Sequence, residues 1–258
     1  MRPIPWFVQS NLQPEPQDEL LAEIKASCSP LIMFEGVPFA PEAPPMPDGR
    51  FFPMGTVNMM ERIREKRPEV VFGGEHFNYR AYLENYGDMM LNAGAWIGRL
   101  ADFSPSAGDF PLFLRPTRDD KSFAGEVWEN PERFKTWRAA ILEGTTIIDP
   151  SVEVLAGPPL NILEEWRVVI ANAAPATQSR YRRLGRRDLS ADGFPATLLE
   201  LVAGALGRWQ PAPLFALDVA LTDAGPRIVE LGSIHSCGLY GCDRRRFVDA
   251  VNGVLRST

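Results

Sequence analysis

The sequence feature that most constrains the fold is a pair of short apolar runs, Leu214–Leu221 and Arg227–Leu231. The first run alternates apolar side chains, and the five residues between the runs include Asp, Gly and Pro, as is typical of a β-hairpin. If the turn centres on Ala224, Asp218 lies opposite Glu230 on one face. Two carboxylates placed in this way repel each other. The hairpin therefore predicts either a cation between the two acids, with magnesium as the candidate, or a solvated outer face.

Length, charge and cysteine usage exclude several classes of protein. The 258 residues suffice for one large or two small domains. A net charge of −6 gives no general affinity for nucleic acid or for an anionic membrane. The three cysteines lack the spacing of a zinc site, and neither a signal-peptide core nor a membrane-spanning apolar run is present. We expect a cytoplasmic protein with no membrane attachment.

Apolar periodicity predicts the elements along the rest of the chain. Helices are expected at Gln17–Ala26, Thr56–Arg67 and Phe194–Arg208, after the Asn130-Pro131 start signal, and after Asp243. Strands are expected at Trp6–Gln9, Val70–Phe72, Phe110–Arg115, Thr145–Ile148, Val152–Leu155, Glu165–Ala171 and Thr177–Tyr181. A connector near Ser104–Asp109 separates a small N-terminal α/β domain, residues 1–109, from residues 110–258. Helices on mostly antiparallel sheets in the second part indicate an α+β fold.

The stretch Phe113–Gly125 is a candidate phosphate-binding loop. It carries Arg115, Arg118 and Lys121 within seven residues, interleaved with two aspartates. Such a loop holds a polyphosphate, or it is a solvated turn with local ion pairs, and neither a P-loop nor a GxGxxG pattern is present.

A second candidate is the strand that begins at Glu164. Glu165 and Arg167 point to the same face of that strand, where the arginine is either an anion ligand or half of a cross-strand ion pair. Arg180 begins a basic run after the next strand. The lone histidines His76 and His235 have no Ser or Cys nucleophile placed beside them, so a catalytic triad is unsupported.

In their order along the chain, these stretches resemble the ATP-grasp superfamily. The stretches that carry the resemblance are FFPMGTVNMMERIRE, NYGDMMLNAG, FLRPTRDDKSFAGEV, EEWRVVI, QSRY and ALDVALTDAGPRIVELGSIHSCGLYGCD. They are most similar to a clade associated with phages and bacteria, in which Arg and Lys are exchanged in the nucleotide-binding strand. The resemblance implies an ATP cleft between two α+β subdomains, with magnesium.

The resemblance also implies roles for individual residues. Arg115 occupies the place of the usual phosphate-binding lysine, and Lys121 offers a lysine in the loop that follows. The implied cofactor-binding residues are Arg115, Lys121, Phe123, Gly125, Glu153, Val154, Leu155 and Glu165. Arg167, Lys121 and Arg180 are the implied catalytic residues, with Glu165 orienting Arg167, and Asp218 and Glu230 match the magnesium carboxylates. The departure from the family pattern is Gly232, which stands where an asparagine usually supplies another magnesium ligand.

The activity that follows from the resemblance is an ATP- and magnesium-dependent ligase. Such an enzyme activates a carboxylate as an acyl phosphate, which an amine or similar nucleophile then attacks. The expected substrates are small-molecule or peptide carboxylates and amines, with no general nucleic-acid binding. Two alternatives remain: a phosphotransferase on the same fold, and a nucleotide-binding module without turnover, which the missing asparagine favours.

Overall fold

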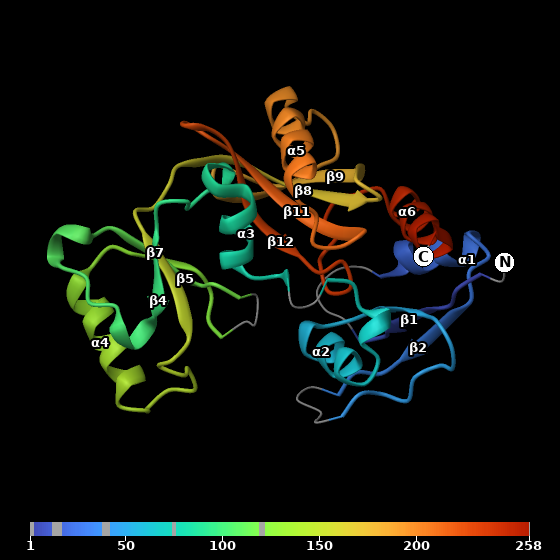
Figure 1. Cartoon of the computed structure of the whole chain (residues 1–258), viewed down its shortest axis with the longest axis horizontal. Coiled ribbons are helices and arrows are strands. Elements are labelled where there is room, and N and C mark those ends of the chain that lie inside the picture. The colour runs from blue at the N-terminus through green and yellow to red at the C-terminus, as the bar shows by residue number, and fades with distance from the viewer. Residues whose placement is uncertain (1–2, 12–16, 38–41, 74–75, 119–121, 258) are drawn as a thin grey trace. The chain divides into compact units, whose positions relative to one another are not determined.

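The structure, a computed structural model, describes residues 3–11, 17–37, 42–73, 76–118 and 122–257. The chain divides into two units (Figure 1). The first contains Met1–His76 and Ile162–Thr258, and the second contains Phe77–Asn161. The division into domains at residue 109 stays a prediction, because a unit defined by its contacts need not coincide with a domain of a family.

A small parallel sheet opens the first unit. Strand β1 (Trp6–Gln9) lies between β2 (Leu31–Phe34) and β3 (Phe52–Met54), and helix α1 (Asp18–Ala26) links β1 to β2. All four residues of β1 are buried, as is usual for a strand in a parallel sheet. The prediction of β1 and α1 is confirmed. The sequence analysis missed β2 and β3, which are only four and three residues long.

The predicted strand at Val70–Phe72 is wrong. Helix α2 (Val57–Lys66) is followed by a 3₁₀ turn, η1 (Pro68–Val70), which Pro68 opens. The backbone N–H of Phe72 then donates to Nε2 of His235 at 2.9 Å instead of to a neighbouring strand. A side chain distant in sequence therefore satisfies this backbone group.

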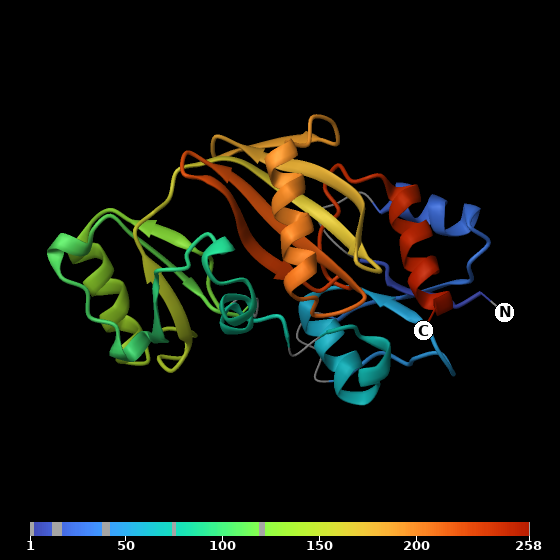
Figure 2. The same cartoon turned by 45° about the horizontal axis from the view of Figure 1, so that its top comes forward.

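The larger sheet of the first unit has the strand order β10-β9-β8-β11-β12. Its strands are β8 (Ile162–Ala171), β9 (Ala174–Arg183), β10 (Arg186–Ser190), β11 (Leu214–Thr222) and β12 (Gly225–Gly232). Helix α5 (Ala196–Arg208) packs on β11 and β12, as Figure 2 shows, and α6 (Arg244–Ser257) packs on β8, β9 and α1. The strands are antiparallel throughout, so the α+β prediction is confirmed.

The β11–β12 hairpin pairs Asp218 with Glu230, as the sequence predicted, but through different geometry. The turn is shorter than expected, because Thr222 already pairs with Gly225. A bulge between Asp218 and Val219 then shifts the register by one residue and brings Asp218 opposite Glu230. The two acids would otherwise be one position out of register and on opposite faces.

The second unit is built on an antiparallel sheet of order β4-β7-β5-β6. Its strands are β4 (Trp96–Arg99), β5 (Leu112–Pro116), β6 (Glu126–Trp128) and β7 (Glu153–Gly157), and its helices are α3 (Tyr79–Tyr86) and α4 (Pro131–Leu142). Short 3₁₀ turns lie at η3 (Gly87–Met89), η4 (Leu100–Asp102) and η5 (Ala107–Asp109). The sheet residues Leu114, Val154 and Ala156 share one core with Phe134 and Ile141 of α4.

Two sequence predictions in this unit have opposite outcomes. Helix α4 starts as predicted, because the Asn130 side chain accepts hydrogen bonds from the backbone N–H groups of Glu132 and Arg133. The predicted strand at Thr145–Ile148 is wrong. These residues form bends and irregular backbone between α4 and β7, and Ile147 is fully exposed there.

Candidate active site

A buried ion pair lies at the centre of the large sheet. Arg167 on β8 and Asp218 on β11 are cross-strand partners. Arg167 donates from Nε to Oδ1 at 2.8 Å and from Nη2 to Oδ2 at 2.7 Å, so both carboxylate oxygens are engaged. Only 8% of Arg167 and 3% of Asp218 are exposed. This bidentate, charge-assisted geometry is the strongest form of Arg–carboxylate contact.

A tyrosine links this ion pair to a second acid on β8. The hydroxyl of Tyr181 on β9 donates to Oε2 of Glu165 at 2.9 Å and lies 3.4 Å from Oδ2 of Asp218. Oε1 of Glu165 accepts a bond from Arg182 at 3.0 Å. Within the described part of the chain, the bonding partners of the Glu165 carboxylate are Tyr181 and Arg182. The implied orienting contact from Glu165 to Arg167 is therefore replaced by a bridge through Tyr181 and Asp218.

The loop after β12, residues 233–243, crosses the same face of the sheet. The carbonyl of Gly238 accepts a hydrogen bond from Nη1 of Arg167 at 2.7 Å. Backbone N–H groups of Gly241 and Asp243 donate to the hydroxyls of Ser179 and Thr177 on β9. These bonds hold the loop over the ion pair and give the Arg167 guanidinium a fixed direction.

Two aromatic rings complete this arrangement. The guanidinium carbon of Arg167 lies 4.9 Å from the centroid of the Tyr240 ring. Tyr240 in turn stacks on Tyr181, with centroids 4.7 Å apart and an interplanar angle of 18°. A buried guanidinium over an aromatic face is favoured electrostatically and keeps its stacking partner in place.

Charges on this face shift the pKa values of its groups. Burial raises the pKa of Asp218, the Arg167 guanidinium opposes this effect, and the nearby carboxylates Glu230 and Glu165 add to it. Burial lowers the pKa of Arg167, but Asp218 outweighs it and holds that pKa well above its ordinary value. Burial, followed by Asp218 and Glu165, raises the pKa of Tyr181 well above the ordinary value, so its hydroxyl stays protonated. Three acids, Asp218, Glu165 and Glu230, therefore influence one another on this face, with Arg167 as the guanidinium bonded to Asp218.

The donor set at the hairpin suits a magnesium ion in its chemistry. Magnesium is commonly held by one or two carboxylates together with substrate phosphates and waters, and Asp218 and Glu230 face each other on adjacent strands. The buried Oγ of Ser233, just beyond Glu230, has no hydrogen-bond partner among the described residues. Within the described ranges, no group of three or more His, Cys, Asp or Glu residues is arranged to hold a metal ion by itself. Each oxygen of Asp218 already accepts one bond from Arg167, so a metal would compete with Arg167 for the lone pairs of this carboxylate.

In the second unit, the structure brings together two of the predicted nucleotide-binding residues. Gly125 approaches β5 so closely that a Cβ there would lie 3.2 Å from Cβ of Arg115 and 3.3 Å from the Phe113 ring. Arg115 and Phe113 lie on the sheet face opposite the core residues Leu112 and Leu114. A side chain at position 125 would be crowded where the loop returns over Arg115, and such a close backbone approach is the kind that phosphate-binding loops use.

The other predicted nucleotide-binding residues have structural contacts. Glu153 accepts bonds from Arg80 at 2.8 Å and from Thr117 at 3.0 Å, and the Arg80 bond lowers its pKa. Val154 and Leu155 are fully buried on β7, between β4 and β5. Their backbone groups therefore form hydrogen bonds with these neighbouring strands. Phe123 packs against Trp137 of α4. Lys121 lies outside the described residues.

Arg180 lies on the opposite face of the sheet from Arg167. It pairs with Trp166, whose ring it covers at 5.5 Å, and it contacts Glu164 and Asp188 at 3.4 and 3.1 Å. Cross-strand partners share a face of the sheet, so Arg180 lies on the face of Trp166. Arg167 is paired with Ser179, on the other face. The structure therefore does not bring Arg180 to the Arg167–Asp218 pair, and we do not assign it a catalytic role.

The sequence indicated no individual role for Tyr181 or Tyr240 in this site. Both lie in stretches on which the family resemblance rests, QSRY and the sequence after Glu230. Their position in these stretches was the signal that could have identified them. His235 is a structural residue: it is fully buried, its Nδ1 bonds the Pro53 carbonyl at 2.7 Å, and its Nε2 accepts from Phe72. Burial lowers its pKa to about 4, so it is neutral near pH 7.

Comparison with known families and structures gives one family match. The family described as ATP-grasp domain, R2K clade family 2, matches residues 94–250, which is more than half of the chain. No curated protein sequence matches significantly. Within the described ranges, no helix is long and apolar enough to cross a membrane.

Solved structures with a similar fold have low sequence identity to this chain. A RimK domain ATP-grasp protein from Sphaerobacter thermophilus is 16% identical with a TM-score of 0.60, covering 97% of this chain and 99% of its own. The ATP-grasp ligase PsnB is 10% identical with a TM-score of 0.58, covering both chains in full. A D-alanine–D-alanine ligase from Bacillus anthracis is 13% identical with a TM-score of 0.53, covering 99% of this chain and 98% of its own. At such identities the similarity concerns the fold.

Proposed function

Because the chain belongs to family 2 of the R2K clade of ATP-grasp domains and has the ATP-grasp fold, we propose that it is an ATP- and magnesium-dependent ligase. It joins a carboxylate, of a small molecule or a peptide, to an amine or a similar nucleophile. The observation that supports this most directly is the pairing of Asp218 with Glu230 beside Arg167, within the residues that match the family.

The proposed reaction has two steps. A carboxylate oxygen of the substrate attacks the γ-phosphorus of ATP, the bond to the β–γ bridging oxygen breaks, and ADP leaves. The amine nitrogen then attacks the acyl carbon, loses a proton and displaces inorganic phosphate. When bound, ATP supplies the phosphoryl group and magnesium offsets the charge of the phosphates.

The residues of the chain bind and orient these groups. Arg115, Lys121 and the loop that ends at Gly125 bind the phosphates, and the strand segment Glu153, Val154 and Leu155 contributes to the base site. Asp218 and Glu230 hold the metal. Arg167 exchanges part of its contact with Asp218 for the transferred phosphoryl group, while Tyr240 keeps its guanidinium in place. The Tyr181 hydroxyl, bonded to Glu165 and 3.4 Å from Asp218, lies beside the carboxylate during that exchange.

A trapping experiment tests this function without a known amine. The protein is incubated with ATP, Mg²⁺, hydroxylamine and a panel of amino acids and short peptides as carboxylate donors. A ligase of this type forms a hydroxamate and releases one ADP for each, because hydroxylamine intercepts the acyl phosphate. A stable phosphorylated product would instead indicate a phosphotransferase. ATP binding with no ADP release across the panel would contradict the ligase and indicate a binding module.

The second candidate, a nucleotide-binding module without turnover, is favoured by two observations on this chain. Gly232 provides no side-chain ligand where the family pattern has an asparagine, and both oxygens of Asp218 are bonded to Arg167. If Arg167 never releases Asp218, the protein binds ATP through Arg115 and its loop but holds the metal weakly. Magnesium-independent ATP binding without turnover is the result that this candidate predicts.

A further inference from the structure

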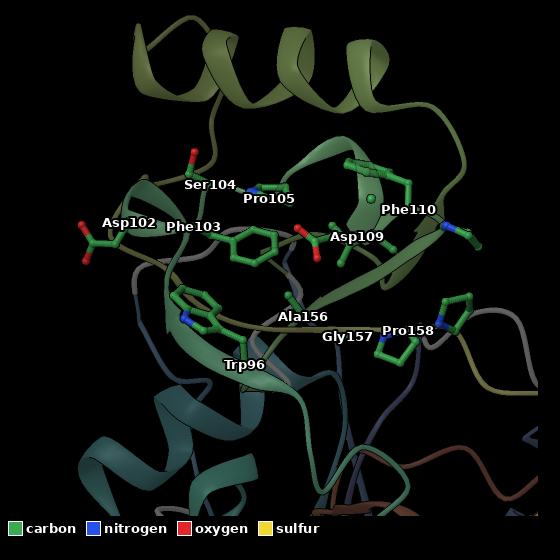
Figure 3. A pocket seen from close by; sticks show the side chains of 14 residues that line it. Trp96, Asp102, Phe103, Ser104, Pro105, Asp109, Phe110, Ala156, Gly157 and Pro158 are labelled. Atoms are coloured by element: carbon green, nitrogen blue, oxygen red, sulfur yellow. The ribbon is translucent and has the colours of Figure 1, made fainter.

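A pocket in the second unit is lined by none of the residues of the candidate active site. Its volume is about 780 Å³, in the range typical of ligand sites. It is lined by Trp96, Phe103, Phe110 and four prolines, with Ala156–Pro159 as its floor (Figure 3). Leu112 and Ala156 at its base belong to the core beneath α4, on the sheet face opposite Arg115. The pocket is therefore separate from the proposed phosphate-binding residues.

The aromatic wall is held in place by packing. The rings of Trp96 and Phe103 are tilted together with centroids 4.7 Å apart, and Phe103 and Phe110 both contact Phe134 of α4, at 6.1 and 5.8 Å. Trp96 is nevertheless 39% exposed. Its indole lies along the strand because residue 98 is glycine: a Cβ there would be 2.6 Å from the ring. The wall is thus preformed and still offers an aromatic surface to a ligand.

The charge of the pocket restricts what it can bind. Among the described residues that line it, there is no Lys, Arg or His, and there are two aspartates. Asp102 forms an ion pair with Arg99 at 2.7 Å and points away from the pocket in Figure 3. Asp109 lies between Phe103 and Phe110 in the same view. Its Oδ2 accepts bonds from the backbone and hydroxyl of Ser106, which lower its pKa and keep it ionised.

These features exclude most ligand classes. An anion such as a nucleotide phosphate is repelled by Asp109. A divalent metal needs several oxygen ligands, and the described lining supplies no such cluster. A neutral apolar group makes no use of the exposed Asp109 carboxylate. An organic cation satisfies both the carboxylate and the aromatic faces.

We propose that this pocket binds a lysine or arginine side chain presented by a peptide segment. The polar lining residues Asp102, Ser104, Gly108 and Asp109 are exposed, so the pocket is too open to enclose a free small molecule. A side chain attached to a peptide needs only one end enclosed, and the peptide backbone remains in solvent. This binding is independent of the proposed ligase activity.

Nuclear magnetic resonance titration of the full chain tests the proposal. The probe is acetyl-Gly-Gly-Lys-Gly-Gly-amide, and the reporter is the indole N–H signal of Trp96, identified with a Trp96→Phe variant. We expect a saturable shift with a dissociation constant on the order of 1 mM, and at least fivefold weaker binding of the same peptide with an Nε-acetylated lysine. Equal binding of the acetylated peptide, or no shift of the Trp96 signal, would overturn the proposal.

Variants separate the two parts of the pocket. Asp109→Asn keeps an oxygen for Ser106 but removes the charge, and it should weaken binding about fivefold. Asp102→Asn removes an equal charge that points away, and it should leave binding unchanged. Gly98→Ala, which displaces the Trp96 indole without deleting any pocket group, should weaken binding by a similar factor. Asp102→Asn weakening binding as much as Asp109→Asn would contradict a site in which the Asp109 carboxylate meets the cation.

Discussion

The buried histidine at position 235 should make the stability of the protein depend on pH in a defined way. Its pKa is about 4 in the folded chain, against an ordinary value of 6.5. The neutral form donates to one backbone carbonyl and accepts from one backbone N–H, so a second proton would remove the acceptor. Its contribution to stability is complete above pH 6.5 and is lost as the pH falls towards 4.

The magnitude follows from the two pKa values. The full difference of about 2.5 units corresponds to about 3 kcal/mol. Linkage gives about 2 kcal/mol of this loss between pH 7.5 and pH 5. Urea unfolding followed by tryptophan fluorescence at these two pH values measures it, and comparison with His235→Asn cancels the contributions of all other titrating groups. The variant should be about 1–3 kcal/mol less stable at pH 7.5, because Phe72 N–H loses its acceptor.

The variant should also lack the additional 2 kcal/mol loss on going to pH 5. Phe72→Leu is the matched control: it removes a ring 5.4 Å from His235 but keeps the backbone N–H that His235 accepts. It should lower stability while leaving the pH dependence of the parent intact. If the loss between pH 7.5 and 5 differs by less than about 0.5 kcal/mol between the parent and His235→Asn, the assignment of a buried neutral histidine is refuted.

Three further predictions concern the candidate site. Arg167→Met should destabilise the protein by about 3–5 kcal/mol, because it leaves the Asp218 charge buried without its partner. In urea unfolding, the double variant with Asp218→Asn should recover part of this loss. If the costs of the two substitutions simply add, a direct ion pair is contradicted. Glu230→Gln should weaken Mn²⁺ binding in the presence of a non-hydrolysable ATP analogue at least tenfold, measured by electron paramagnetic resonance, while Asp223→Asn at the hairpin turn should not. Gly125→Ala should weaken ATP binding in calorimetry because its Cβ crowds Arg115, whereas Gly94→Ala, which meets no atom within 4 Å, should bind ATP as the parent does.

The sequence contained enough local information to predict the hairpin and its acids. Period-two alternation and a turn rich in Asp, Gly and Pro are local signals, and they located β11 and β12. The turn itself was predicted too long, and a bulge that no local pattern announces restored the pairing of Asp218 with Glu230. The prediction of the pair is therefore confirmed, although the reason given for it is incomplete.

Contacts between residues distant in sequence could not be predicted in the same way. His235 bonds groups 163 and 182 residues away, and nothing near His235 in the sequence indicates either partner. The face occupied by Arg180 depends on the register between β8 and β9, which pairs it with Trp166 and contains an irregularity at the next position. Register is set by the packing of a whole sheet, so Arg180 and Arg167 could not be assigned to opposite faces from the sequence.

The ion pair at Arg167 changes how the acids of the hairpin are understood. From the sequence, the opposition of Asp218 and Glu230 called for a cation between them, and the structure provides one from the next strand. The same guanidinium that neutralises Asp218 is the group expected to meet a transferred phosphoryl group, so one arginine has two anionic partners that compete for it. A metal at the carboxylates would free Arg167 for the phosphate, and its absence would return Arg167 to Asp218. Metal and substrate should therefore bind cooperatively in a ligase of this kind. In Arg167→Met, each of the two should still bind, but the presence of one should no longer strengthen the binding of the other.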